Sequence, residues 1–338
     1  MGTSTTTAGG DRSGLERSPL SRLPDRALSW GLTSLAILIL ALIVFFFIRL
    51  IGESGSTFRT FGISFVFGND WDVSRNIFHG APLVVGTLIT SGVALLIGVP
   101  VAVATALYLT ELCPRRMRAP LSGLVDLLAA VPSVVYGLWG VFFLAPKLLP
   151  AEKWFANTFS FIPWIGGGGS SATPTNYFIA SLVLAIMILP IVSAISREVL
   201  ATVPAENKEA ALALGATRWE MIRMAVLPYS RSGIVGGAML GLGRALGETI
   251  AIVLLIGDAP VIGHHLFSQG YSLAAVIANE FGEAQGIHRS ALFAAGLVLF
   301  VVTLLVNILA RFYVARGSRG MRGGAGPEIA TVAAGPLP

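Results

Sequence analysis

The stretch Glu209-Ala210-Ala211-Leu212-Ala213-Leu214-Gly215 lies in a polar, charged segment between two long apolar runs. Its first six residues have the composition of a short helix, and Gly215 permits a sharp turn after them. Ala216–Leu227 predicts a second helix, which Pro228 is expected to close because proline lacks the backbone N–H that a helix needs. We therefore predict that Ala205–Pro228 is a compact helix–turn–helix, able to act as a rigid lever on the rest of the chain.

The apolar runs around this segment are typical of a membrane protein. Hydrophobic residues make up 54% of the chain and charged residues 12%, which excludes an ordinary soluble domain. A helix needs about 20 apolar residues to cross a bilayer. We predict an all-α integral membrane protein with six transmembrane helices, from the runs Ala27–Ile48, Ala81–Thr110, Leu127–Pro146, Thr175–Ser196, Ser232–Gly257 and Ser290–Ala310.

The positions of Lys and Arg predict the orientation of these helices. Basic residues are concentrated in both tails, at Arg115–Arg118 and between Arg197 and Arg231, all on the same side of six spans. Because such residues accumulate on the cytoplasmic side, both termini are predicted to be cytoplasmic. The net charge of +5 is mostly this asymmetry, so it gives little support to nucleic-acid binding.

The apolar runs and the composition of the segments between them divide the chain into four parts. Residues 1–26 and 317–338 are rich in small and polar residues and are predicted to be disordered cytoplasmic tails. Residues 27–80 hold the first helix, which we expect to be uncleaved, and an extracytoplasmic loop. Residues 81–316 form the transmembrane core with the cytoplasmic loop 205–228. Two extracytoplasmic segments, Gly52–Gly80 and Lys153–Pro174, are rich in aromatic residues, as in an interfacial belt or a docking surface for an external partner.

The fifth run is the only one that carries charge, at Arg244 and Glu248. On a helical wheel, Gly233, Gly237 and Gly241 share one narrow stripe with both charges, and small residues let another helix approach closely. We therefore expect the stripe to face protein. Arg244 lies roughly 18 Å past Ser232, near the bilayer midplane, where a charge costs about 2.5–3.5 kcal/mol.

Two compatible interpretations explain why the chain carries a charge at this depth despite the cost. Arg244 and Glu248 are i, i+4 neighbours and can form a structural ion pair. Alternatively, Arg244 lines an anion pathway, where its planar fork of donors binds an oxyanion. A carboxylate beside the path favours phosphate over sulfate, because phosphate keeps a P–OH that can donate to Glu248.

The third run contains Pro132, which is expected to open the helix locally, as is frequent near transport sites. This makes Ser133 a candidate substrate contact. Asp126, near the cytoplasmic interface, is either a gate or a solvated carboxylate. Cys113 is the single cysteine, so no internal disulfide is possible, and the adjacent His264 and His265 do not suit metal ligation on one helix face. We predict no metal site and no catalytic residues.

Two motifs carry a resemblance to known families. Glu209–Gly215 with Leu227-Pro228 resembles the coupling loop of ATP-binding-cassette (ABC) importer permeases, although Ala225 stands where an Ile is usual. Gly241-Leu-Gly-Arg-Ala-Leu-Gly-Glu-Thr249 resembles the PstC-type permease family of bacterial phosphate importers, as does Ala130–Gly140. The sister PstA family usually continues with Ala-Pro, where this chain has Ile250-Ala251-Ile252.

The resemblance implies the type I ABC importer fold in the bacterial plasma membrane, over roughly Ala27–Arg316. It implies a substrate pathway with Arg244, Glu248, Ser133 and Thr249, and ATPase coupling through Glu209, Ala210, Ala211 and Gly215. It also implies a PstA-like second permease, two copies of a PstB-like ATPase that bind ATP and Mg, and a PstS-like phosphate-binding protein. No cofactor is expected in this chain.

The residues themselves leave the energy source open. The sequence has no Gly-x-x-x-x-Gly-Lys phosphate-binding loop, so energy comes from a partner or from a gradient. The first prediction is a permease of a phosphate-importing ABC transporter. The alternatives are a permease for another oxyanion (molybdate, tungstate or sulfate), a gradient-driven secondary transporter, and a receptor that signals phosphate status to a kinase.

Overall fold

The computed structural model describes residues 23–166, 173–263 and 265–322. Helices account for nearly all regular structure in these ranges, and the only strands described there, β1 (Trp71–Asp72) and β2 (Ile77–Phe78), form a small antiparallel hairpin. The chain forms two units, one ending at Gly52 and one beginning at Glu53. The predicted tails lie mostly outside the described residues.

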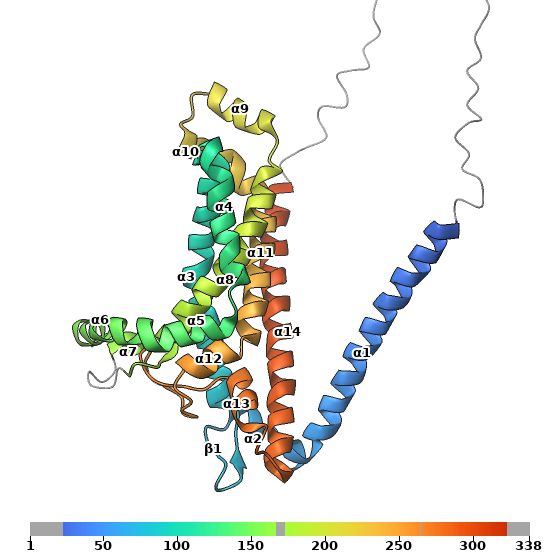
Figure 1. The fold of residues 1–338 in the computed structure, drawn as a ribbon, viewed down its shortest axis with the longest axis vertical. Helices are drawn as coiled ribbons and strands as arrows, with labels where there is room; N and C mark the ends of the chain where they lie inside the picture. Colours follow the sequence, from blue (N-terminus) through green and yellow to red (C-terminus); the bar gives the residue numbers. More distant parts are fainter. Residues whose placement is uncertain (1–22, 167–172, 264, 323–338) are drawn as a thin grey trace, which may run out of the picture. The chain divides into compact units, whose positions relative to one another are not determined.

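Long apolar helices occur where four of the six runs predicted them. They are α1 (Leu23–Phe61), α3 (Ala81–Leu107), α8 (Tyr177–Ala201) and α14 (Gly286–Arg322). Each is long and apolar enough to cross a membrane, and a fifth candidate span covers Ser133–Thr158. In Figure 1, α3, α8 and α14 run side by side, with α9 (Ala205–Ala213) at one end of this bundle and α13 (Leu273–Glu280) towards the other.

The third apolar run is interrupted at Pro132, as its sequence predicted. Helix α4 (Arg115–Ala130) ends before Val131, whose ψ of 126° is extended, and α5 (Ser133–Trp139) starts after Pro132, with ψ 142°. Proline lacks an N–H and disfavours helical geometry in the residue before it, which explains the break. The π-helical segment η4 (Gly140–Leu144) then joins α5 to α6 (Ala145–Thr158).

The fifth apolar run is not one helix. Helix α11 (Leu227–Gly247) ends before Glu248, which is extended with ψ 129°, and α12 (Ile250–Leu255) begins after Thr249. Gly243 and Gly247 weaken the last turn of α11, because glycine costs about 1 kcal/mol relative to alanine in a helix. The helical wheel drawn across Glu248 is therefore wrong beyond Gly247.

Close packing in the bundle depends on glycine. A Cβ at Gly233 would lie 2.4 Å from Val199 Cγ2, and one at Gly241 would lie 2.7 Å from Val192 Cγ2. Gly233 and Gly241 of the predicted stripe therefore pack against α8, since small residues let two helices approach closely. Helix α3 approaches α8 in the same way at Gly98, where a Cβ would be 3.0 Å from the carbonyl oxygen of Ala185. The expectation that Arg244 shares this packed face is wrong for the isolated chain, in which Arg244 is exposed.

The two aromatic-rich segments, Gly52–Gly80 and Lys153–Pro174, differ from each other. In the first, Phe65 and Trp71 are buried in the core, where Phe58 and Phe78 pack edge-on against them, so the interfacial-belt interpretation is wrong for these two residues. The short helix α2 (Ser64–Phe67) belongs to this segment. In the second, Trp154 on α6 and Trp164 on α7 (Pro163–Gly166) are exposed, as a belt or a docking surface requires.

Candidate functional site

Arg244 lies in the last turn of α11 and is exposed in the isolated chain. Glu248 follows the end of this helix and is half-buried. No salt bridge between the two side chains is found within the described residues. An i, i+4 pair needs helical geometry across both residues, and the extended backbone at Glu248 removes it. The structural ion pair considered from the sequence is therefore absent from this conformation.

Ser133 is the first residue of α5 and is half-buried. One turn later, the buried hydroxyl of Tyr136 donates to the carbonyl oxygen of Leu128 at 2.8 Å, which bridges the break between α4 and α5. Arg244 lies within electrostatic reach of Tyr136. The charge of Arg244 therefore acts on the part of α5 that holds Tyr136, although the two residues are far apart in the sequence.

The two helix breaks lie side by side because α5 packs against α12. A Cβ at Gly137 would lie 2.7 Å from Leu254 Cδ1 and 3.2 Å from Ala251 Cα. Thr249 immediately precedes α12, and its hydroxyl donates to the carbonyl oxygen of Gly247 at 3.2 Å, which partly caps the free end of α11. The structure thus brings the segments of Ser133, Arg244 and Thr249 to one place, with Glu248 within the second break.

This place has the chemistry of an anion site. A guanidinium supplies several N–H donors in one plane, and hydroxyl groups add further donors. Tyr136 lies within the stretch Ala130–Gly140, but no pattern in the sequence assigned it to the site.

Asp126 is an exposed carboxylate, as one of the two interpretations from the sequence held, and it is paired. Its Oδ1 accepts a hydrogen bond from Arg197 Nη2, which links α4 to α8. The Arg197 side chain is largely covered, whereas Asp126 is more exposed. Because the partners lie 71 residues apart, no local sequence pattern signals this pair.

Loop 205–228 has the predicted helix–turn–helix form. Helix α9 ends at Ala213, Gly215 has a φ of +84°, and Thr217 begins α10 (Arg218–Met221) with a capping box to Glu220. Positive φ is the conformation that glycine adopts without strain. The backbone and side-chain hydrogen bonds from Thr217 hold the pKa of Glu220 below its usual value.

The second helix of the loop does not end at Pro228. The π-helical segment η5 (Ile222–Val226) follows α10 and continues directly into α11, in whose first turn Pro228 lies. Proline is tolerated in a first turn, and the wide π turn before it relieves the clash of its ring with the carbonyl four residues earlier. The loop is therefore continuous with the helix that carries Arg244.

The coupling residues predicted from the sequence lie on an exposed surface. Glu209, Ala210 and Gly215 are exposed and Ala211 is half-buried. Beside them, Leu214 is 90% exposed. One further contact was not foreseen: Lys208 Nζ lies 2.6 Å from Glu111 Oε1, so α9 is tied to the π-helical segment η3 (Tyr108–Leu112) at the end of α3.

No group of three or more His, Cys, Asp or Glu side chains able to hold a metal occurs in the described parts of the chain. His264, half of the histidine pair considered from the sequence, lies outside those parts.

Comparison with known proteins places these features in a family. The family model "Binding-protein-dependent transport system inner membrane component" matches residues 98–319, which include both helix breaks and loop 205–228. A solved bacterial ABC transporter "involved in the import of the acidic polysaccharide alginate" has the same fold, with a TM-score of 0.52 and 21% identity over 87% of this chain and 98% of that chain.

Curated relatives are much closer in sequence. The chain is 42% identical over 286 residues to the "Phosphate transport system permease protein PstC" of Pasteurella multocida, covering 83% of this chain and 88% of the relative. It is 43% identical over 293 residues to the "Phosphate transport system permease protein PstC 2" of Mycobacterium tuberculosis, covering 86% and 90%. The chain therefore belongs to the binding-protein-dependent inner-membrane transport components and, among them, to the PstC permeases.

Proposed function

We propose that this chain is the PstC-like permease subunit of an ATP-driven importer of inorganic phosphate. The chain is a multi-pass inner-membrane permease rather than an ATP-hydrolysing subunit, and ABC permeases of its family work with an ATPase and a binding protein. The names of the curated relatives support phosphate as the substrate. Six spans with both termini in the cytoplasm remain part of this proposal, with α11, the break at Glu248 and α12 together forming the fifth.

The substrate pathway in this proposal passes Arg244. Its exposed guanidinium next to two adjoining helix breaks is the observation that carries the assignment. A second, PstA-like permease would cover this exposed face, so the pathway would lie between the two permeases. Ser133 and Thr249 add hydroxyl donors, and Glu248 accepts a hydrogen bond from the P–OH of phosphate.

Energy enters through the cytoplasmic loop. Two copies of a PstB-like ATPase would bind ATP and Mg, and one of them would dock on the surface of Glu209, Ala210, Ala211 and Gly215. The exposed side chain of Leu214 supports this docking, because a large apolar group that is 90% exposed favours burial against a partner. A PstS-like binding protein would deliver phosphate on the opposite side.

Uptake of radiolabelled phosphate tests this proposal, in cells that express the chain with its partner subunits at matched membrane levels. Arg244→Ala should reduce uptake at least about tenfold, the effect of losing about 1.4 kcal/mol of binding. Arg231→Ala is the matched control, because Arg231 is an exposed arginine near the start of the same helix. It should retain uptake.

Competition by excess sulfate separates the possible substrates. Uptake that is indifferent to sulfate supports phosphate, whereas inhibition by sulfate would transfer the assignment to a general oxyanion permease. Equal uptake by the Arg244→Ala and Arg231→Ala variants would refute the role of Arg244. Unchanged transport of both anions by Glu248→Gln would refute the role of that carboxylate in selectivity.

A further inference from the structure

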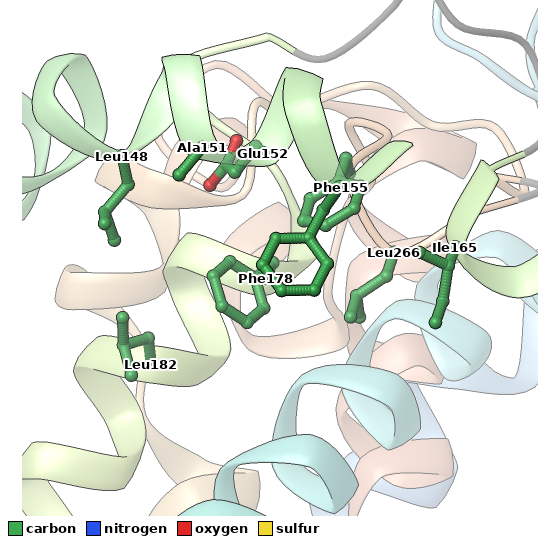
Figure 2. Close-up of a pocket in the computed structure, with 9 residues that line it drawn as sticks. Leu148, Ala151, Glu152, Phe155, Ile165, Phe178, Leu182 and Leu266 are labelled. Atoms are coloured by element: carbon green, nitrogen blue, oxygen red, sulfur yellow. The ribbon is translucent and has the colours of Figure 1, made fainter. Parts of the chain in front are cut away.

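The cavity beside α6 offers nothing that would hold an anion. It has a volume of about 350 Å³ and is lined by apolar side chains such as Phe155, Phe178 and Leu182. Figure 2 shows Glu152, the acidic residue of this lining, on the α6 side. Its Oε2 accepts a hydrogen bond of 2.8 Å from Asn176 Nδ2, so this carboxyl group joins α6 to the start of α8. The cations that could hold an anion therefore lie elsewhere.

Arg197 and Asp126 form a second charged site, on the part of the bundle nearer loop 205–228. Arg197 lies in α8, and its Nη2 donates to Asp126 Oδ1 on α4. The side chain of Arg197 is 16% exposed and that of Asp126 is 54% exposed, so water reaches the pair from the carboxylate side. In Figure 1, α4 lies between α5 and the end of the bundle that carries α9.

The packing of α8 on α11 gives the level of this pair relative to Arg244. A Cβ at Gly237 of α11 would lie 3.2 Å from Ile195 Cγ2 of α8, and Arg197 follows Ile195 on the side towards the loop. The α11 segment from Gly237 to Arg244 is roughly 10 Å long, and Arg197 lies beyond its Gly237 end. An anion that leaves Arg244 towards loop 205–228 would therefore next reach the level of Arg197.

Helix α4 links the pair to the surroundings of Arg244. Leu128, next but one to Asp126 on α4, accepts the hydrogen bond from Tyr136, the residue on which the charge of Arg244 acts. Helix α4 has no buried residue, so it is uncovered in the isolated chain, as Arg244 is. In the function proposed above, the second permease covers this exposed face. The pair would then border the same pathway as Arg244.

The ion pair is weak enough to be exchanged for another anion. A guanidinium binds an oxyanion most tightly through two parallel N–H groups. The contact with Asp126 uses Nη2, whereas Nε of Arg197 is buried and has no acceptor among the described residues. An ion pair with one partner more than half exposed contributes at most about 1 kcal/mol. Displacing Asp126 from the guanidinium therefore costs little.

We propose, on the basis of the function proposed above, that Arg197 is a second anion-binding residue, which holds phosphate before its release, and that Asp126 expels it. The arriving phosphate oxygens take the place of Asp126 on the guanidinium. The displaced carboxylate repels the anion and returns to Arg197 as the anion leaves towards the cytoplasm. Only hydrogen bonds are exchanged, and the ion pair is restored at the end of each transport cycle.

Uptake of radiolabelled phosphate into proteoliposomes that contain the complete transporter tests this role. Asp126→Asn removes the competing carboxylate, so phosphate should stay on Arg197 longer. We expect the maximal rate and the KM to fall together by about threefold to fivefold, the equivalent of up to about 1 kcal/mol, because a slower release step lowers both. Glu198→Gln is the matched control, since Glu198 is an exposed carboxylate on the same helix, and should change neither value. Unchanged kinetics of Asp126→Asn would overturn the inference.

A double variant separates anion binding from a clamp between α4 and α8. Asp126→Leu with Arg197→Met replaces the pair by apolar groups of similar size, an exchange that often leaves stability unchanged or raises it. The transporter should keep its melting temperature but lose uptake at least about tenfold, the equivalent of about 1.4 kcal/mol. If this variant does not fold, the kinetics of Asp126→Asn decide.

The outcomes distinguish this role from the proposed function. Uptake at the wild-type rate by the double variant, together with loss of uptake in Arg244→Ala, would overturn the role of Arg197 and leave the proposed function intact. A wild-type transporter that imports no phosphate would refute both.

Discussion

Replacement of Gly86 by alanine gives a sharp test of how α3 packs. A Cβ at Gly86 would lie 2.0 Å from the carbonyl oxygen of Tyr271, in the segment that leads into α13. Real Cβ contacts are essentially never closer than 3.0 Å, so the two backbones must separate by at least about 1 Å. No side-chain rotation can relieve this contact, because the obstructing atom belongs to the main chain.

The required separation has a cost that follows from one neighbouring hydrogen bond. The N–H of Leu273 donates to Thr87 Oγ1 at 2.9 Å, and this bond joins the same two segments. A displacement of about 1 Å would stretch it beyond hydrogen-bonding distance, which costs about 1 kcal/mol. Overpacking of a tight interior adds about 1–3 kcal/mol. We therefore expect Gly86→Ala to destabilise the folded chain by about 2–4 kcal/mol.

Gly92→Ala is the matched control, because Gly92 lies on the same helix and a Cβ there would meet nothing within 4 Å. Fluorescence-detected thermal unfolding of the purified protein in one detergent measures both variants. Gly86→Ala should lower the apparent melting temperature by about 3–6 °C, and Gly92→Ala should leave it unchanged or slightly raised. Equal melting temperatures for the two variants would refute the packing argument.

Three further predictions concern the cytoplasmic loop. Lys208→Met leaves the largely covered carboxylate of Glu111 unpaired, at a cost of about 1–3 kcal/mol, and should therefore uncouple ATP hydrolysis from uptake in the assembled complex. The double variant Lys208→Glu with Glu111→Lys restores the pair and should recover part of the coupling. No recovery would contradict the role of the pair. Because the folded-state pKa of Glu220 is lowered, the capping box stabilises the loop above the unfolded-state pKa and loses this effect as the pH falls through the folded-state value. Limited proteolysis of the loop should therefore accelerate at acidic pH in the wild type, and Thr217→Ala should remove that pH dependence. Gly215→Val should impair co-purification with the ATPase because a β-branched residue is strained at a φ of +84°, whereas Gly215→Asn should impair it less.

The sequence predicted the helices well and their interruptions unevenly. Hydropathy identified α1, α3, α8 and α14, since burial in lipid requires long apolar runs. The break at Pro132 was predictable because proline acts locally. The break at Glu248 was not, because that segment contains no proline and its extended backbone depends on contacts between α12 and α5.

The candidate site was predictable only as separate pieces. Sequence motifs selected Arg244, Ser133 and the loop around Gly215. The proximity of Ser133 to Arg244 depends on tertiary packing. The same holds for the pair of Asp126 with Arg197 and for the buried Glu152, whose partners come from other helices. Local patterns describe which residue types are present, whereas these contacts depend on how distant helices meet.

The adjoining interruptions in the two helix pairs have a mechanical consequence. Helix α5 packs against α12 at Gly137, and the following segment η4 does so at Gly140, so these elements form one block, whereas α11 is continuous with loop 205–228. The interruptions then act as a shared hinge, because a few extended residues can absorb a change in direction that a helix resists. A push on the loop tilts α11 about this hinge while the block stays in place. In the function proposed above, a change in this angle would alter the spacing between the segments of Arg244 and Ser133, and with it the binding of an anion between them.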